Sequence, residues 1–176
     1  MRDVRDQRHS PALAAASASK ILIRPMAPHD YVAVCKMTDR NRARVPLTAR
    51  EVRNLCRQQW VVASVAEPYT GDVDGRASYQ PIVGFMFHAV FPDHFEFFDL
   101  MIDRPHRRRG IGTLMARQVT NRLCPGRRLR AIADVPETNL PAQLFLRSLG
   151  FRCVKTIDNR PMPDVYRFSL RVESGT

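Results

Sequence analysis

A strand that runs into a basic, glycine-containing turn and then into an amphipathic helix leaves this chain few architectures to choose from. Residues 97–102, FFDLMI, are mostly aromatic and aliphatic and predict a strand, and the run DRPHRRRGIGT follows at 103–113. From Gly110 onward, apolar side chains recur at helical spacing. They are Ile111, Leu114, Met115, Val119 and Leu123.

Such a turn is suited to a phosphorylated ligand. The first N–H groups of a helix have no partner within it, and the positive end of the helix dipole lies beside them. Gly110 and Gly112 let the backbone approach phosphate oxygens without a Cβ in the way. Arg107, Arg108 and Arg109 add charged donors. The alternative interpretation is a basic helix start with incidental glycines.

Two other phosphate-binding loops fit the turn less well. A Walker A loop needs Gly-Lys-Ser/Thr, and the turn contains no lysine. A dinucleotide fingerprint needs three glycines and an acidic residue about 20 positions later. Only two glycines are present.

The run RRRGIG at 107–112 resembles the Arg/Gln-x-x-Gly-x-Gly/Ala acetyl-coenzyme A motif of the GNAT acetyltransferases. A second block, NLPAQLF at 139–145 followed by LGF at 149–151, is similar to that superfamily's Asn-x-x-Ala-x-x-Leu-Tyr…Gly-Phe block, in the usual order and separation. The resemblance covers about residues 21–172, and its specific part, 96–151, looks closest to ribosomal-protein alanine N-acetyltransferases.

The resemblance implies a three-layer α-β-α fold with a mixed, mostly antiparallel sheet of six or seven strands. The strands at 97–102 and 129–135 would splay apart and admit the pantetheine arm of acetyl-CoA. Backbone groups on the first strand would pair with that arm, the turn would hold the pyrophosphate, and the later helix would border the thioester. The cofactor-binding residues implied are Leu100, Met101, Ile102, Arg107, Arg108, Arg109, Gly110, Ile111, Gly112, Thr113, Asn139 and Phe145.

Three carboxylates are candidate bases for deprotonating an amine. Glu96 lies eleven residues before Arg107, where the histone-acetylating branch of the superfamily carries its glutamate base. Asp134 stands where the ribosomal-protein branch carries its glutamate. Asp99 lies on the strand of Glu96, and alternation predicts that it faces the other side. We favour Glu96 over Asp134, because aspartate is shorter than the glutamate it would replace. Each could instead be a surface or ion-pairing carboxylate.

A proton donor for the leaving thiolate is harder to find. Many members of the family carry a tyrosine in the second block, and we place Phe145 at that position. Phenylalanine has no proton to give, so Tyr166 or water is the expected substitute. His88 and His94 could relay a proton or could be structural.

The cost of deprotonating the acceptor amine narrows the class of acceptor only in part. Deprotonating a lysine at pH 7 costs about 4.6 kcal/mol, against roughly 1 to 1.4 kcal/mol for an α-amine. A protein or peptide α-amine, or a weakly basic small-molecule amine, is therefore favoured. Two other readings stay open: a catalytically weak acyl-CoA sensor, because of Phe145, and a basic nucleic-acid-binding module.

Composition adds limits to these hypotheses. The net charge of +11 predicts attraction to polyanions such as nucleic acid or a ribosome-like surface, although no RNA-binding motif is present. With 176 residues, 44% of them hydrophobic, we expect one domain over 21–172, a disordered tail at 1–20 and a short tail at 173–176.

The cysteines and the apolar runs complete the expectations. The four cysteines have no Cys-x-x-Cys pair, so no metal is implied, and three of them are expected to be buried: Cys35, Cys56 and Cys153. No run of apolar residues is long enough for a membrane span, and we expect a cytoplasmic protein. The sequence does not distinguish a monomer from a dimer.

Overall fold

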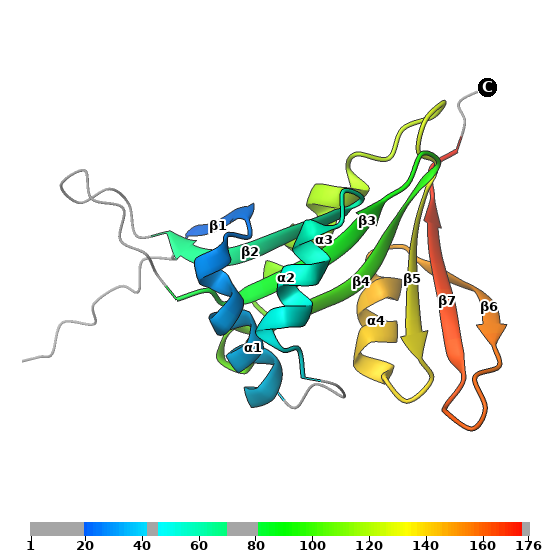
Figure 1. The fold of residues 1–176 in the computed structure, drawn as a ribbon. Helices are drawn as coiled ribbons and strands as arrows, with labels where there is room; N and C mark the ends of the chain where they lie inside the picture. Colours follow the sequence, from blue (N-terminus) through cyan, green and yellow to red (C-terminus); the bar gives the residue numbers. More distant parts are fainter. Residues whose placement is uncertain (1–19, 42–45, 70–80, 174–176) are drawn as a thin grey trace, which may run out of the picture.

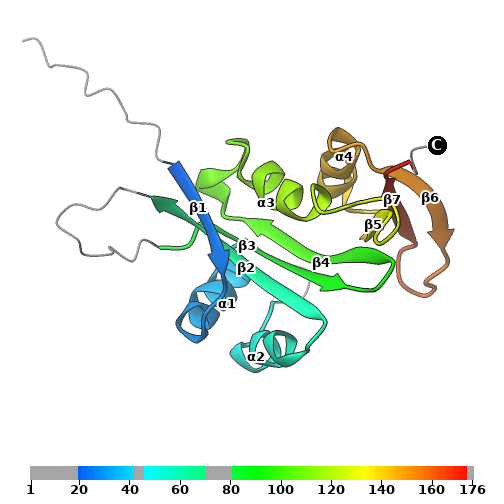
Figure 2. The ribbon, with the colours of Figure 1, turned by 90° about the horizontal axis from the view of Figure 1, so that it is seen from above.

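The computed structural model describes residues 20–41, 46–69 and 81–173. Within those residues, seven strands form one sheet with helices on both faces (Figures 1 and 2). The strands are β1 (Lys20–Pro25), β2 (Val61–Tyr69), β3 (Gly84–Val90), β4 (His94–Ile102), β5 (Arg130–Pro136), β6 (Arg152–Ile157) and β7 (Val165–Arg171). The α-helices are α1 (Tyr31–Arg40), α2 (Ala49–Arg57), α3 (Ile111–Thr120) and α4 (Leu140–Ser148), with short 3-10 turns η1 (Pro28–Asp30) and η2 (Arg104–His106).

The strand order is β1-β2-β3-β4-β5-β7-β6. Every neighbouring pair is antiparallel except β4 and β5, which are parallel. The predicted three-layer fold with a mixed, mostly antiparallel sheet is therefore confirmed. Helix α2 begins with a capping box: the Thr48 hydroxyl accepts a hydrogen bond from Glu51 N at 3.3 Å, and the Glu51 carboxylate accepts one from Thr48 N at 2.8 Å.

Each face of the sheet carries its own core. Helices α3 and α4 cover one face, and α1 with α2 covers the other, mainly over β1 to β4 (Figure 2). The α3/α4 core is built from Ala66, Val83, Met86, Phe95, Ile111, Met115, Val119, Ala131, Ala133, Val135, Leu146, Phe151 and Phe168. The α1/α2 core is built from Val34, Met37, Val52, Val61, Val65, Ile82, Phe85 and Phe87.

The central strands β4 and β5 pair over only a few residues and then separate. They pair only from His94 opposite Arg130 to Phe97 opposite Ala133. From residue 98 onward β4 follows β3, while β5 follows β7 (Figure 1). The predicted splayed pair is confirmed, and the sheet opens there between its two halves.

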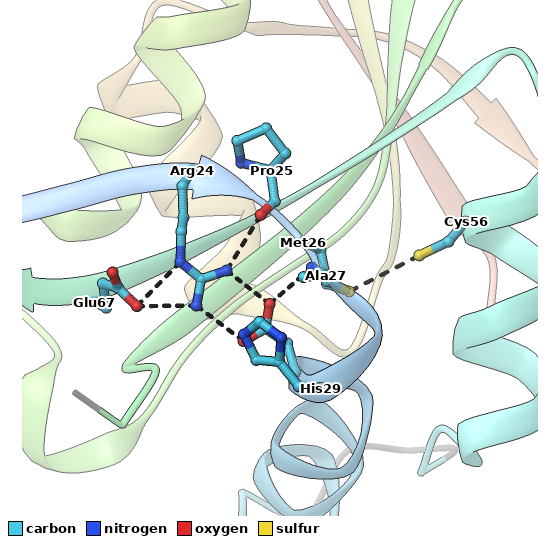
Figure 3. A network of polar contacts seen from close by, with 8 residues as sticks. Arg24, Pro25, Met26, Ala27, His29, Cys56 and Glu67 are labelled. Carbon is cyan, nitrogen blue, oxygen red and sulfur yellow. Dashed lines mark hydrogen bonds and ion pairs between the residues drawn. The ribbon is translucent and has the colours of Figure 1, made fainter. Parts of the chain in front are cut away.

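A buried ion-pair network fixes β1 against η1 and β2 (Figure 3). The Arg24 guanidinium donates to both carboxylate oxygens of Asp30, at 2.7 and 3.0 Å, and to Glu67 Oε2 at 2.9 Å. Ala27 N donates to Asp30 Oδ2 at 2.8 Å. Burial alone would raise the pKa of Asp30, but the bonds from Arg24 and Ala27 outweigh it and hold that pKa below its usual value.

The cysteines are more exposed than the sequence predicts. Cys153 is exposed and Cys35 and Cys56 are only half-buried, so the prediction of three buried thiols is wrong. For Cys153 the reason is position, because β6 is an edge strand whose residues are exposed along most of its length.

The predicted tail at 1–20 lies outside the described residues except Lys20, which already belongs to β1, and 174–176 lie outside them too. In the part of the chain that the structure describes, no helix is long and apolar enough to cross a membrane.

Candidate functional site

The turn between β4 and α3 has the backbone geometry of an anion-binding nest. Arg108 and Gly110 both adopt left-handed conformations, with φ of 62° and 80°. The first helical hydrogen bond of α3 runs from Leu114 N to Gly110 O, so the preceding N–H groups at 111–113 emerge at the helix end. The N-cap residue, Gly110, has no side chain to cap that end. Successive N–H groups in such alternating conformations converge on one point, where an anion is stabilised.

The turn is tied to the C-terminus of α1 by buried polar contacts. Asn41 Oδ1 accepts from Arg104 N at 3.1 Å and from Arg107 Nη2 at 2.9 Å, and Asn41 Nδ2 donates to Asp103 Oδ1 at 3.0 Å. Asp103 also pairs with Arg40. Sequence analysis missed Asn41, because no local pattern predicts a contact between positions more than sixty residues apart.

Arg107 differs from its two neighbours in what its side chain does. Its Nε donates to Ile102 O at 2.8 Å and its Nη2 bonds Asn41, so the guanidinium fastens the turn to the end of β4 and to α1. The side chains of Arg108 and Arg109 are exposed. Of the three arginines predicted as charged donors to a phosphate, these two extend into solvent.

A cavity of about 200 Å³ occupies the gap between β4 and β5. The cavity adjoins the first turn of α3. A Cβ placed on Gly112 in that turn would be 3.5 Å from Leu100 Cδ2 and 3.5 Å from the Phe145 ring, and both of these side chains line the cavity. The complete lining is Phe97, Phe98, Asp99, Leu100, Ala116, Ala133, Asp134, Val135, Pro136, Asn139, Ala142, Phe145, Leu146, Leu149 and Phe151.

The edge of β4 that borders this cavity has backbone groups free of β5. Asp103 N donates to Val83 O, so the backbone N–H and C=O of Asp103 point towards β3. Going back along β4 from Asp103, every second residue points its backbone groups the same way. Met101 is one of these, in register with Phe85. Leu100 and Ile102 then face the open edge, and Ile102 O already accepts from Arg107. Of the three residues expected to pair with a ligand strand, Leu100 and Ile102 face the gap.

A β-bulge at Phe98 changes which face Asp99 occupies. Asp99 is opposite Phe87 on β3, but Phe97 is opposite His88, so Phe98 is an extra residue without a partner. Asp99 therefore shares the face of Phe87, which is also the face of Glu96. The prediction that Asp99 and Glu96 lie on opposite faces is wrong, because simple alternation does not survive a bulge.

The carboxylates differ in surroundings. Asp99 lines the cavity, and burial raises its pKa to about 6, an effect opposed only by the nearby Leu100 N–H. Asp134 also lines the cavity, but both its oxygens accept from Arg167, at 2.8 and 2.7 Å. Glu96 is half-buried on β4 and is not among the lining residues.

Tyr166 and the two histidines lie away from the cavity lining. Tyr166 packs against the α3/α4 core. His88 is 3% exposed between Phe95 and Phe97, and burial, assisted by Arg122, lowers its pKa to about 4, so it is neutral at pH 7. His94 stacks on Phe91 and contacts Asp93 at 2.7 Å.

Helix α4 carries the residues at the far end of the cavity. Asn139 caps it, accepting from Ala142 N at 3.3 Å, and Phe145 and Leu146 both line the cavity. Counted along the Asn-x-x-Ala-x-x-Leu-Tyr block from Asn139, the tyrosine position is 146. Our placement of Phe145 there is wrong by one residue. Leu146 stands at that position and likewise has no proton to give.

Comparison with known proteins gives a family and a set of similar folds. Residues 37–151 match the model of the acetyltransferase (GNAT) family. NAA60 of Arabidopsis thaliana in complex with acetyl-CoA is similar, with a TM-score of 0.70 at 17% identity, over 87% of this chain and 100% of that one. The ribosomal-protein-S18-alanine N-acetyltransferase of Escherichia coli has a TM-score of 0.67 at 14% identity, over 89% and 97%.

An aminoglycoside 6'-N-acetyltransferase complexed with coenzyme A is similar too, with a TM-score of 0.62 at 14% identity, over 85% of this chain and 96% of that one. No curated protein matches the chain by sequence.

Proposed function

The chain belongs to the GNAT acetyltransferase family, and from that premise we propose that it moves an acetyl group from acetyl-CoA to a primary amine by direct attack in a ternary complex. Membership of the family makes it an acyltransferase. The observation that carries the proposal is the continuity of the nest, the open edge of β4 and the cavity between the splayed strands. Direct attack is favoured because no cysteine is among the residues that line the cavity.

The cofactor residues follow from that continuity. In the proposal, the N–H groups at 108–113 hold the pyrophosphate, with Arg108 and Arg109 adding charge. Leu100 and Ile102 offer backbone groups to the pantetheine arm, while Met101 supports the strand from the β3 side. The apolar walls at Ala133, Phe145 and Leu146 surround the thioester end. This fit supports acetyl-CoA as the co-substrate.

The acceptor is proposed to approach from the sheet face opposite α3 and α4. On that face α1 and α2 cover β1 to β4, and among the described residues no helix lies over the half built by β5, β7 and β6 (Figure 2). The face carries the carboxylates Glu96, Asp99 and Asp134. Asp134 is already paired with Arg167, so Glu96 and Asp99 are the carboxylates near the gap that favour a cationic acceptor such as a protonated amine.

An aromatic wall beside the gap, formed by Phe98, Trp60 and Phe91, favours one kind of acceptor over another. The Phe98 ring lines the cavity, is 43% exposed, and contacts Trp60 edge-on at 5.8 Å between ring centroids. Trp60 stacks on Phe91 at 6.0 Å. This wall suits an acceptor with an apolar group next to its amine, such as a peptide N-terminus, better than a polyhydroxylated sugar.

The deciding experiment is a screen for acetyl-dependent thiol release. Purified protein is mixed with acetyl-CoA and, separately, with peptides that begin with alanine, serine or methionine, with spermidine and with kanamycin. We expect turnover with at least one peptide and more with peptides than with kanamycin. Binding of coenzyme A by calorimetry without turnover of any amine would instead support an acyl-CoA sensor.

A further inference from the structure

Asp99 is the one cavity-lining carboxylate whose oxygens no cation occupies among the described residues. The Phe98 bulge brings it to the acceptor face at the point where β5 leaves β4. The neighbouring N–H of Leu100 lies on the open edge of the strand, and it is the backbone group that contacts the Asp99 carboxylate. Asp99 thus lies where the proposed acceptor and the thioester meet.

The other two carboxylates are less suited to accept a proton. Asp134 is held bidentately by Arg167, so both its oxygens are occupied and its negative charge is compensated. Glu96 lies farther back on β4, where that strand is still paired with β5, and it does not line the cavity.

Resting on the proposed acetyl transfer, we propose that Asp99 is the general base that deprotonates the acceptor amine. The acceptor ammonium gives one proton to Asp99. The nitrogen lone pair then forms the C–N bond with the acetyl carbon while the C–S bond breaks. The second proton of the nitrogen leaves with the thiol sulfur, and Asp99 later returns its proton to water. Atoms and charge balance, and no separate acid is required.

The surroundings of Asp99 support this role. Its β3 partner is Phe87, and the helices packed on that sheet face present apolar residues, Val34 and Met37 from α1 and Val52 from α2. On the open half of the sheet this face also carries charged groups from four strands: Glu96 on β4, Arg130 and Asp134 on β5, Arg167 and Arg171 on β7, and Lys155 on β6. Burial is the main influence on the pKa of Asp99, which at about 6 leaves the group ionised at pH 7 yet basic enough to take a proton.

The test is a pH profile of kcat/KM from pH 5 to 8 on the peptide that the wild type acetylates best. We expect the wild-type rate to fall on acidification with a midpoint near the pKa of Asp99, about 6. Asp99→Asn should lower kcat by about 100-fold or more and remove that acidic limb. Asp99→Glu should recover part of the rate and shift the limb. Calorimetric affinity for coenzyme A should stay unchanged in both.

Thermal stability separates a base from a structural carboxylate. Burial disfavours the charged form, so ionised Asp99 destabilises the fold above its raised pKa and costs nothing below the unfolded value near 4. Asp99→Asn should therefore melt higher than wild type at pH 7.5 and equally at pH 4. Asp158→Asn, on the exposed loop after β6, is the matched control and should change neither rate nor profile.

Each contrary result has a distinct meaning. A wild type that acetylates no amine overturns the proposed function itself. A wild type that is active while Asp99→Asn keeps its rate and its acidic limb overturns only the role of Asp99. Loss of the acidic limb in Glu96→Gln, with the limb retained in Asp99→Asn, would place the base at Glu96 and also overturns the proposal.

Discussion

Single residues in the β4–α3 turn have backbone conformations that their side chains must tolerate. Gly110 has φ of 80°, and a Cβ placed there would meet nothing within 4 Å. Alanine at this position has room but the wrong backbone preference. We expect Gly110→Ala to cost about 1 kcal/mol of unfolding free energy and to weaken coenzyme A binding about tenfold, because the N–H groups no longer converge. Urea unfolding and calorimetry measure the two effects.

Gly112 provides the matched control for that prediction. A Cβ on Gly112 would make ordinary contacts of 3.5 Å with Leu100 and Phe145, and the residue lies within helix α3. The family's motif accepts glycine or alanine at this position, so Gly112→Ala should keep coenzyme A affinity and raise stability by a few tenths of a kcal/mol, up to about 1. Equal loss of affinity in both variants would mean that bulk at the turn matters and the left-handed backbone does not.

The missing tyrosine gives a second prediction at the level of single residues. Leu146 occupies its position and borders the cavity, so Leu146→Tyr should place a phenol near the leaving sulfur. We expect a severalfold increase in kcat, small because a thiol near pKa 8.5 leaves readily without help. Phe145→Tyr adds the same hydroxyl one position earlier and should leave kcat unchanged. A gain from Phe145→Tyr alone would show that helix α4 presents that residue to the sulfur.

Between elements, the Arg24 network holds β1 and η1 on the sheet. Arg24→Met should cost about 3 kcal/mol at pH 7, because Asp30, with a side chain only 4% exposed, loses its counter-ion. The depressed pKa of Asp30 stabilises the wild type above the unfolded value near 4, and this contribution disappears as the pH falls. The difference between the two proteins should therefore narrow in urea titrations as the pH falls below about 4.

Arg130→Met tests whether any lost arginine has this effect. Arg130 pairs with Asp93 at 2.8 Å, but their side chains are 48% and 61% exposed. Solvent screens such a pair, so its removal should cost no more than about 0.5 kcal/mol. A comparable cost for both variants would contradict the importance given to burial at Asp30.

At the scale of the whole molecule, a basic chain attracts anions nonspecifically, so binding at the site must be distinguished from binding to the charged surface. Coenzyme A at a hundred times its Kd should add about 2.7 kcal/mol and raise the melting temperature by about 5 to 10 °C. NAD and ATP carry similar phosphates but no pantetheine, so at equal concentration they should shift it far less. Equal shifts from all three would indicate that the net charge of +11, and no formed site, binds them.

The sequence by itself determined the elements and the phosphate turn of this protein. Helical spacing from Ile111, the capping box at Thr48 and the glycines around the turn are local signals, and each acts within a few residues of the chain. The splayed strands were expected from the resemblance of two blocks, 107–112 and 139–151, because their order and separation are characteristic of one fold.

Only the tertiary structure decided which groups meet in the gap. The Phe98 bulge appears when β4 is laid against β3, and it moves Asp99 to the face of Glu96. Arg167 reaches Asp134 from β7, and Asn41 reaches the turn from α1. These contacts join positions far apart in the chain, so register, burial and charge at each carboxylate depend on the packed sheet and cannot be read from local spacing.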